Sequence, residues 1–528
     1  MYKPTTSMPL ASYQVISPAD NQVDFQAGQI VRFTIPRSIG FFDPHTSRVQ
    51  FEVATTGNNY KMVMGQDCGV ASLIDMIRVS QNGVVLSETT EYSTLANMLC
   101  SYSESLSVAQ RQATQNGARD YVNIDGNKTD NQSQTDTSGA ILGEPLNGDS
   151  SVAMDRTVKK YQMELKGIGL FELLSVVPSI ALGDVLVELR LASQNVQGIK
   201  VHPATTVRQT CAAVTDGDTT ITLTPPFIGF TNLSDSPYVN GMRVVLQAAD
   251  GTAPSADVVN LTGASQTSAF TGATDGQIVL TCNAMTAASA GKVGLVITRG
   301  SDDVVAADPT TAFVVRKASM VLQVVRPPPQ YVESIAKKVQ EGLMLDLNTY
   351  TTYRTQIRSA TRNQTLDIPS FVSRARAVFS IPRFQSGALG NAQAAFTLNN
   401  ATDFDTQGQY QQLANYRTQV GELYYPNQPV ALDQFLNSYH FSAQHIVELE
   451  KALRAASIPL RNLKKAKQNF VVPRCLAKYG STVNLEKGLR VYLQYDGVVN
   501  PVQSLDVVTF VNHINRVMIT PAGIQVLS

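Results

Sequence analysis

The sequence is poor in the residues that small redox and metal-binding proteins depend on. It contains no tryptophan and only five cysteines in 528 residues. The cysteines are widely scattered, with no CxxC pair and no spacing to a histidine that would suit a metal ion. They are Cys68, Cys100, Cys211, Cys282 and Cys475. Neither a disulfide scaffold nor a zinc site is indicated, and we expect no cofactor.

Long apolar runs are also missing. No stretch approaches the roughly 20 consecutive apolar residues that span a bilayer. The N-terminal stretch MYKPTTSMPLASYQVISPADNQ has no basic start followed by an apolar core, so no secretory signal is indicated. We therefore expect a protein that is made in the cytosol, is not secreted and has no transmembrane segment.

The chain has no excess of charge of either sign. Its 42 basic and 42 acidic side chains give a formal net charge of zero at pH 7. A protein whose main work is to coat a polyanion by charge alone needs a strong basic excess. That class of protein is therefore disfavoured, although local basic patches are compatible with the overall balance.

Complete catalytic motifs are absent as well. No GxxxxGK[ST] or GxGxxG follows a strand, so neither a P-loop nor a dinucleotide-binding fold is indicated. The segment Gln66-Asp67-Cys68-Gly69 superficially resembles a thiol-protease signature, but no histidine stands in a recognisable partner motif. We predict that the protein is not an enzyme.

What the chain does contain is a long series of short β-segments. Several of them alternate apolar with polar residues, as half-buried antiparallel strands do. The candidate strands are QIVRFTIPR (29–37), SRVQFEVAT (47–55), DVLVELRLA (184–192), SMVLQVVRP (319–327), RAVFSIPR (376–383), LRVYLQYDG (489–497) and VTFVNHINRVMIT (508–520). Helical spacing is confined to residues 89–113, 331–342 and 434–456. The chain is therefore mainly β with a few short helices.

Residues 72–99 predict a hairpin that passes directly into a helix. Asn82 and Gly83 tolerate the positive φ of a two-residue type I′ turn, and apolar residues flank them. Beyond the hairpin the apolar spacing changes to three or four residues, which predicts one buried helical face. That face contains Tyr92, Leu95, Met98 and Leu99, with Ser87 or Thr89 as the N-cap.

A chain of 528 residues is too long for a single hydrophobic core, so we expect several domains. Changes in composition along the chain indicate their boundaries. Residues 123–151 are rich in Asn, Asp, Ser, Thr and Gly, which predicts a long surface loop. Residues 201–311 are rich in Thr, Ala, Gly and Val and predict a small all-β unit inserted between two strong strands. The run of prolines 327–329 predicts a stiff hinge.

We therefore predict four parts in chain order. Residues 1–200 form a first β-sandwich, and residues 201–311 form the inserted β-rich domain. Residues 312–330 contribute the last strand of the first sandwich and the hinge, and residues 331–528 form a second sandwich.

One stretch of the second sandwich, 451–478, carries basic side chains and no acidic ones. Its basic residues are Lys451, Arg454, Arg461, Lys464, Lys465, Lys467, Arg474 and Lys478. A solvated face or a subunit contact is the favoured interpretation, and a basic surface turned toward nucleic acid is the weaker one. Only Phe470 interleaves the run, so stacking of single-stranded bases has little support.

The order of these segments resembles a known family. In the first half the likeness lies in IVRFTIPRSIGFFDPHTSRVQFEV, SLIDMIRV, NGVVLSETTEYSTLANML, LFELLSVVPSIALGDVLVELRLA and FVVRKASMVLQVVRPPPQYVESI. In the second half it lies in LDIPSFVSRARAVFSIPRF, NYRTQVGELYYPNQPVAL and LRVYLQYDG. Together they resemble the double jelly-roll major capsid proteins of Polinton-like viruses and virophages. Residues 201–311 have no match in this pattern.

The resemblance implies two tandem jelly-roll sandwiches with an inserted small all-β domain, residues 201–311, which we expect to face outward from the capsomer. It further implies a homotrimer whose six jelly rolls form a pseudo-hexameric capsomer, and a virion shell of icosahedral symmetry around double-stranded DNA. The implied partners are other copies of the chain, penton proteins and minor capsid proteins, with only indirect contact to the genome. The lack of a basic N-terminal arm fits this role, because Lys3 is the only basic residue among the first 28.

Two other classes stay open on composition. A β-rich adhesin or fibre protein would bind glycan through residues 201–311 and use the sandwiches as spacers. A glycoside hydrolase on a sandwich scaffold would need a cleft with convergent carboxylates, and it ranks last.

Overall fold

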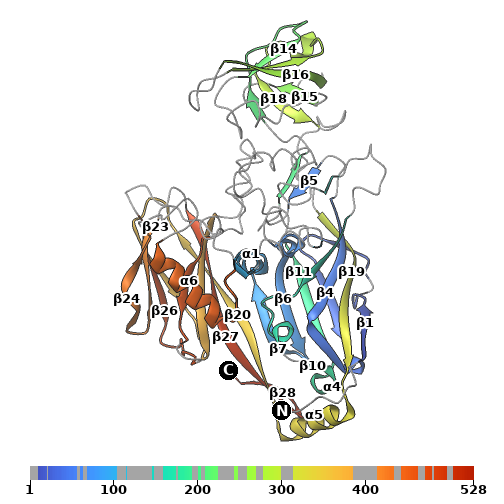
Figure 1. The fold of residues 1–528 in the computed structure, drawn as a ribbon, viewed down its shortest axis with the longest axis vertical. Coiled ribbons are helices and arrows are strands. Elements are labelled where there is room, and N and C mark those ends of the chain that lie inside the picture. Colours follow the sequence, from blue (N-terminus) through green and yellow to red (C-terminus); the bar gives the residue numbers. More distant parts are fainter. Residues whose placement is uncertain are drawn as a thin grey trace.

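The fold is known from a computed structural model that describes most of the chain. The described residues are 10–20, 22–55, 60–63, 68–103, 115, 146–147, 159–173, 176–192, 200–203, 208–223, 243–247, 258–268, 277–298, 313–384, 413–432, 442–461, 470–477, 481–495 and 504–527. Two β-sandwiches stand side by side, and a smaller β module lies at one end of the molecule (Figure 1).

The first sandwich consists of two antiparallel sheets. One sheet has the order β1 (Leu10–Ile16), β19 (Phe313–Arg326), β4 (Phe41–Thr55) and β10 (Val177–Pro178), with β2 (Asp24–Gln26) beside β19 and β9 (Lys159–Glu164) beside β4. The facing sheet has the order β3 (Ile30–Ile35), β11 (Val185–Leu191), β6 (Ile74–Gln81) and β7 (Val84–Thr90). On β11 buried and half-buried residues alternate strictly, as its sequence predicts.

The second sandwich repeats this plan. One sheet has the order β20 (Leu343–Ile357), β27 (Leu505–Thr520), β22 (Ala375–Phe384) and β25 (Val472–Cys475), with β28 (Gly523–Leu527) beside β27. The facing sheet has the order β21 (Asn363–Ile368), β26 (Leu489–Tyr495), β23 (Leu413–Val420) and β24 (Leu423–Ala431).

The strand order in both sandwiches is that of a jelly roll. If β20 to β27 are counted from one to eight, one sheet reads 1-8-3-6 and the other reads 2-7-4-5. Counting β1, β3, β4, β6, β7, β9, β11 and β19 gives the same two orders in the first sandwich. This is the double Greek key of a jelly roll. The predicted fold class of two tandem jelly rolls is confirmed.

The helices in the described ranges are short and lie between strands. They are α1 (Tyr92–Ser103), α4 (Ser179–Leu182), α5 (Pro329–Glu341) and α6 (Ala443–Ala455), with 3-10 turns at Arg37–Ile39, Val70–Leu73, Gly169–Glu172 and Ala287–Ser289. The predicted extensions over 104–113 and 434–441 lie outside the described residues. Within the described ranges, no helix combines the length and apolar character needed to cross a bilayer.

The predicted hairpin is confirmed. Asn82 and Gly83 have φ of 46° and 83°, and Gln81 pairs with Val84 across the turn. The predicted N-cap is wrong, because Ser87 and Thr89 lie inside strand β7 and the helix begins at Tyr92.

The segment between β11 and β19 contains a separate six-stranded sheet. Its order is β13 (Arg208–Thr210), β18 (Gly294–Thr298), β15 (Arg243–Gln247), β16 (Val258–Ser268), β17 (Gln277–Cys282) and β14 (Thr220–Leu223). This sheet has its own buried cluster, which includes Ile221, Leu246 and Leu280. The flanking strands β11 and β19 belong to opposite sheets of the first sandwich, so they are not neighbours.

A three-stranded sheet lies between this module and the first sandwich (Figure 1). It joins β12 (Lys200–Pro203) to β5 (Tyr60–Val63) and β8 (Leu146–Asn147). Strand β12 therefore pairs with β5, which follows β4 of the first sandwich in the chain. The predicted long loop over 123–151 lies outside the described residues except for β8.

Candidate functional site

Helix α1 lies between the two sandwiches and contributes side chains to both cores. One stripe, spaced four residues apart, joins the core of the first sandwich and consists of Tyr92, Ala96 and Cys100. A second stripe joins the core of the second sandwich and consists of Leu95, Met98, Leu99 and Tyr102. The sequence predicts a single apolar face, whereas the helix has two. Because each stripe is buried in a different core, α1 fixes the sandwiches to one another.

Strands of the second sandwich also contribute side chains to the core of the first. Leu347, Val517 and Ile519 belong to the core cluster of the first sandwich. The approach is close enough to require glycine at position 169, where a Cβ would lie 2.9 Å from the Cβ of Leu347. Such a distance is too short for two carbon atoms that are not bonded, so a larger residue would push the sandwiches apart.

Polar links cross the same junction. Thr352 Oγ1 donates a hydrogen bond of 2.9 Å to the carbonyl oxygen of Thr90, and Asn515 Nδ2 donates one of 3.2 Å to that of Leu86. Both acceptors lie on β7, the edge strand of its sheet. An exposed edge strand is a template for unwanted pairing, and these side chains cover it.

A buried carboxylate joins three segments of the junction. Glu172 accepts hydrogen bonds from the backbone N–H of Gly167, at 2.6 Å, and from Asn348 Nδ2, at 3.0 Å. Burial raises the pKa of Glu172, although both bonds oppose the rise. Asn348 Oδ1 in turn accepts a bond of 2.7 Å from Asn512 Nδ2. This chain of bonds connects the first sandwich to β20 and β27.

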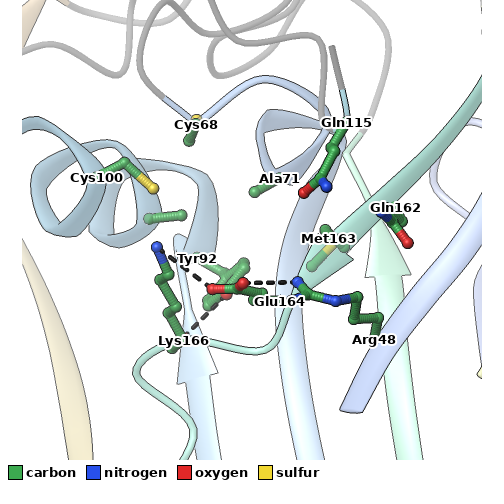
Figure 2. A pocket seen from close by; sticks show the side chains of 11 residues that line it. Arg48, Cys68, Ala71, Tyr92, Cys100, Gln115, Gln162, Met163, Glu164 and Lys166 are labelled. Atoms are coloured by element: carbon green, nitrogen blue, oxygen red, sulfur yellow. Dashed lines mark hydrogen bonds and ion pairs between the residues drawn. The ribbon is translucent and has the colours of Figure 1, made fainter. Parts of the chain in front are cut away.

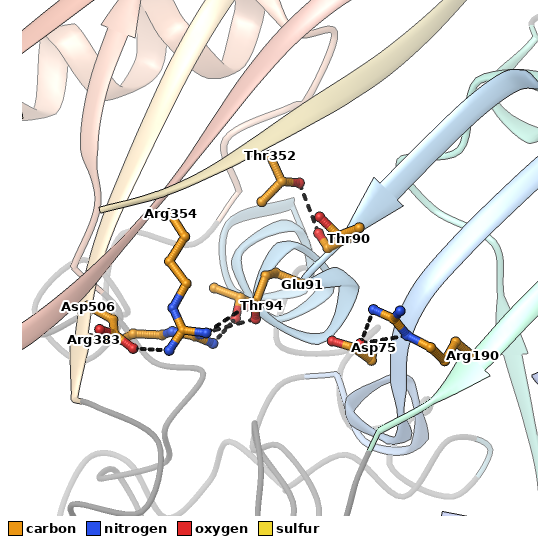
Figure 3. Close-up of polar contacts among 9 residues, drawn as sticks. All are labelled: Asp75, Thr90, Glu91, Thr94, Arg190, Thr352, Arg354, Arg383 and Asp506. Atoms are coloured by element: carbon orange, nitrogen blue, oxygen red, sulfur yellow. Dashed lines mark hydrogen bonds and ion pairs between the residues drawn. The ribbon is translucent and has the colours of Figure 1, made fainter. Parts of the chain in front are cut away.

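A cluster of ion pairs lies at the start of α1 (Figure 3). Glu91 has a φ of 55°, an uncommon conformation for a residue other than glycine, and its carbonyl accepts bonds from Thr94 and Leu95 of α1. Its carboxylate lies 3.0 Å from Arg383 Nη2 and 3.7 Å from Arg354 Nη1. The ion pairs therefore hold the strand-to-helix corner of the first sandwich against the second.

Arg383 is fully enclosed in this cluster. Its side chain is 1% exposed, and Nη1 donates a bond of 3.0 Å to Thr94 Oγ1. Arg354 also pairs with Asp506 of β27. Breaking a buried ion pair on one side leaves an uncompensated charge and costs about 3–5 kcal/mol. The cluster therefore fixes which orientation of the two sandwiches is tolerated.

A small cavity beside α1 gives no sign of catalysis (Figure 2). Its volume is about 30 Å³, room for about one water molecule, and both Cys68 and Cys100 line it without any histidine. Glu164 sits between Arg48 and Lys166; burial favours its neutral form, but the two cations together lower its pKa. The usual base partner of a thiol nucleophile is a histidine, and none is among the described residues that line this cavity.

Among the described residues, no cluster of three or more His, Cys, Asp or Glu side chains could hold a metal ion. At the start of α1 the ionised groups are bound to each other, which suits packing and charge pairing.

The described part of the basic run does not form one free patch. Arg474 has a side chain that is 14% exposed, pairs with Glu448 at 2.7 Å and lies over the ring of Tyr425. Lys451 pairs with the same carboxylate at 3.2 Å, and the backbone N–H of Arg461 donates to the carbonyl of Tyr102 on α1.

The other predicted contact residues are placed differently. Arg454 is exposed in the last turn of α6. Lys464, Lys465, Lys467 and Lys478 lie outside the described residues. The contact role of the run stays a prediction.

Sequence reasoning missed the residues of the ion-pair cluster. One signal was available: Arg383 stands between Pro382 and Phe384, and residues 377–382 of the same strand are apolar apart from Ser380. A charged residue in such a strand indicates a buried partner. Its identity, Glu91, could not be read from local patterns.

No family model matches the sequence, and no curated protein matches it. Solved structures do resemble it. PBCV-1 VP54, as fitted into a cryo-EM reconstruction of the virophage Sputnik, is 12% identical and has a TM-score of 0.51 over 100% of this chain and 99% of that chain. The Faustovirus major capsid protein is 10% identical and has a TM-score of 0.50 over 98% of this chain and 92% of that chain. These likenesses extend over both sandwiches, and at such low identity they establish the fold.

Proposed function

We propose that the chain is the major capsid protein of a double-stranded DNA virus. The observation that carries the proposal is the same jelly-roll strand order in two sandwiches that share helix α1. The similar Faustovirus structure is that of a major capsid protein. The lack of a complete catalytic motif in the sequence agrees with a structural role.

The proposed unit is a homotrimer. Three copies bring six jelly rolls together, and a pseudo-hexagonal capsomer requires the two rolls of each copy to keep one relative orientation. The shared helix, the close approach at Gly169 and the pairing of Glu91 with Arg383 supply that rigidity. Permanent assemblies of this kind typically bury more than about 2,000 Å² per contact.

Further parts of the chain receive roles within this proposal. The module of β13 to β18 is expected at the outward end of the capsomer, where insertions between strands are tolerated. The basic residues between Lys451 and Lys478 are expected to contact neighbouring subunits or minor capsid and penton proteins. Contact with the genome is the weaker expectation, and the expected location is the virion.

The test is the state of assembly of the purified full chain. Light scattering should give the mass of a trimer at micromolar concentration, and electron microscopy should show compact particles that form hexagonal arrays. A stable monomer would contradict the proposal. Elongated particles that bind glycans without forming arrays would favour the adhesin class instead.

Excision of residues 208–298 sharpens the test. A Gly-Ser bridge in their place keeps β12 and its pairing with β5, and the trimer should persist because the module has a buried cluster of its own. Loss of soluble trimer would show that the module belongs to the core or to the trimer contact.

A further inference from the structure

A crevice of about 300 Å³ opens between the two sandwiches beside β7. Its walls come from β7 on one side and from β20 and β27 on the other. The residues that line it are Val85, Ser87, Glu88, Thr90, Thr349, Tyr350, Thr351, Thr352, His513 and Asn515. The two hydrogen bonds that tie β7 to the second sandwich, at Leu86 and at Thr90, come from Asn515 and Thr352 of this lining.

The lining changes character along a single sheet. Nearer the start of β20, Leu347 packs into the core of the first sandwich, whereas Thr349, two residues later on the same face, lines the crevice. On β27 the directly opposed residues are Asn515 and His513. The apolar contact between the sandwiches thus gives way to a surface of hydroxyl, amide and imidazole groups.

The lining includes buried hydroxyls without a hydrogen-bond partner in the described ranges, among them those of Ser87 and Thr349. Ser87 is 2% exposed and Thr349 is 1% exposed, and neither side-chain oxygen has a hydrogen-bond partner within the described part of the chain. A buried polar group left unpaired costs about 1–3 kcal/mol. Such groups in the wall of a roomy polar site are suited to bind a molecule that offers both donors and acceptors.

The crevice holds no unpaired charge in the described structure. Glu88 is bound to Arg78 at 2.6 Å, and Thr351 Oγ1 lies 2.8 Å from His513 Nε2. Burial lowers the pKa of His513 to about 4, so the imidazole is neutral at pH 7. A charged ligand would enter without a counter-charge, which is unfavourable in a half-enclosed site.

We propose that this crevice binds a small, neutral, polyhydroxylated molecule, either a polyol or a sugar unit. Hydroxyl groups both donate and accept, as the unpaired Ser87 and Thr349 require. The volume is at the lower end for ligand pockets and accommodates a molecule up to about the size of a monosaccharide. The site is distinct from the inserted module, and it does not depend on the capsid role.

The experiment is ligand-observed NMR on the full-length protein with glycerol, glucose, galactose and mannose as probes. Saturable binding by at least one neutral probe is expected, with glucuronate and glucosamine at least about tenfold weaker because each carries a charge. Binding by glycerol alone would assign a polyol site, and preference for a hexose would assign a sugar site.

Variants locate the binding. Thr349→Val and Ser87→Ala each remove one hydroxyl, and each should weaken binding roughly three- to tenfold, the effect of one hydrogen bond. Val85→Trp changes a residue that is 41% exposed at the mouth, so it should block entry without disturbing the core. Thr365→Val, on an exposed position of β21, is the matched control and should bind like the wild type.

Two results would overturn the proposal. One is the absence of saturable binding by every neutral probe to protein that is folded by circular dichroism, which would assign the crevice to ordered water. The other is binding that survives Val85→Trp together with both hydroxyl deletions, which would place the ligand elsewhere.

Discussion

Helices α1 and α6 occupy the same place in the two jelly rolls, and they differ in almost everything else. Each follows the fifth strand of its sandwich and precedes the sixth. In α1 every residue from Tyr92 to Tyr102 is buried. In α6 only one stripe is buried, and it consists of His445, Glu448, Leu449, Ala452 and Leu453.

The difference shows that the surroundings of a helix in the folded protein, and not its place in the strand order, decide which of its faces are buried. Helix α6 covers one sandwich and has solvent on its other side, so its sequence is amphipathic. Helix α1 has a sandwich on each side. A helix that is enclosed all round would ordinarily be apolar all round, yet α1 keeps Thr94, Asn97 and Ser101. At least Thr94 has a defined role, because its hydroxyl accepts from Arg383.

The two helices also begin differently. Ser442 caps α6 in the usual way, with its hydroxyl accepting from the N–H of His445. Helix α1 begins after Glu91, whose side chain is directed to Arg383 and Arg354 of the other sandwich. The start of α6 is therefore a local device, whereas the start of α1 is a tertiary contact.

The largest expected effect comes from Arg383→Met, which leaves Glu91 in the junction without its enclosed partner. The free energy of unfolding should fall by about 3–5 kcal/mol, measured by chemical denaturation. Adding Glu91→Gln to this variant should recover part of the loss, because the remaining carboxylate is then uncharged. Arg490→Met removes an exposed pair with Asp367 and should leave the denaturation midpoint unchanged. A midpoint for Arg383→Met equal to that of the control would contradict the junction's role.

Leu95→Ala in α1 and Leu449→Ala in α6 should cost similar free energies, about 2–5 kcal/mol, because both side chains are fully buried. The two substitutions should differ in how much of the molecule they loosen. Hydrogen exchange should rise in both sandwiches for Leu95→Ala and only in the second for Leu449→Ala. If both substitutions raised hydrogen exchange only in the second sandwich, α1 would not couple the two cores.

Acid should weaken the second sandwich through His445 of α6. Its ring stacks on Phe470, Nδ1 lies 3.0 Å from Tyr416 Oη, and burial lowers its pKa to about 3. The unfolded chain takes up the proton near pH 6.5, so this contribution is complete above that pH and declines as the pH falls toward 3. At about pH 5 the loss is about 2 kcal/mol.

The measurement compares unfolding free energies at neutral and acidic pH for the wild type and His445→Gln. The wild type should lose about 2 kcal/mol more than the variant between pH 7 and about pH 5. Parallel pH profiles for the two proteins would show that His445 is not held neutral.

The smallest effect is expected on the outer face of α6. Val447 is 45% exposed, and Val447→Ala should change the free energy of unfolding by no more than about 0.5 kcal/mol. Thermal unfolding of this variant checks the amphipathic character of α6. A loss of several kcal/mol would mean that this face is covered in the assembled protein.

Local chemistry was enough to predict much of the fold. The turn at Asn82 and Gly83 follows from their tolerance of positive φ, and strand β11 follows from alternation between apolar and polar residues. The order of such segments predicted two tandem sandwiches, and the resemblance to a known family identified them as jelly rolls. These features depend on neighbours in sequence or on a repeated pattern, which a single sequence displays.

The junction depended on contacts between distant parts of the chain. The spacing of apolar residues in α1 predicted one buried face. Periodicity shows which side chains are apolar, but it does not show into which core each of them packs. Nothing local distinguishes Tyr92, which packs in the first core, from Leu95, which packs in the second.

The sequence by itself determined the strands, the hairpin and the two sandwiches, since backbone preferences and alternation act over a few residues. Only the tertiary structure decided that Glu91 meets Arg383, that Gly169 meets Leu347 and that Ser87 and Thr349 face a common crevice. Each of these contacts joins one sandwich to the other. Their geometry is set by how two finished sandwiches pack, and no local preference of the chain encodes it.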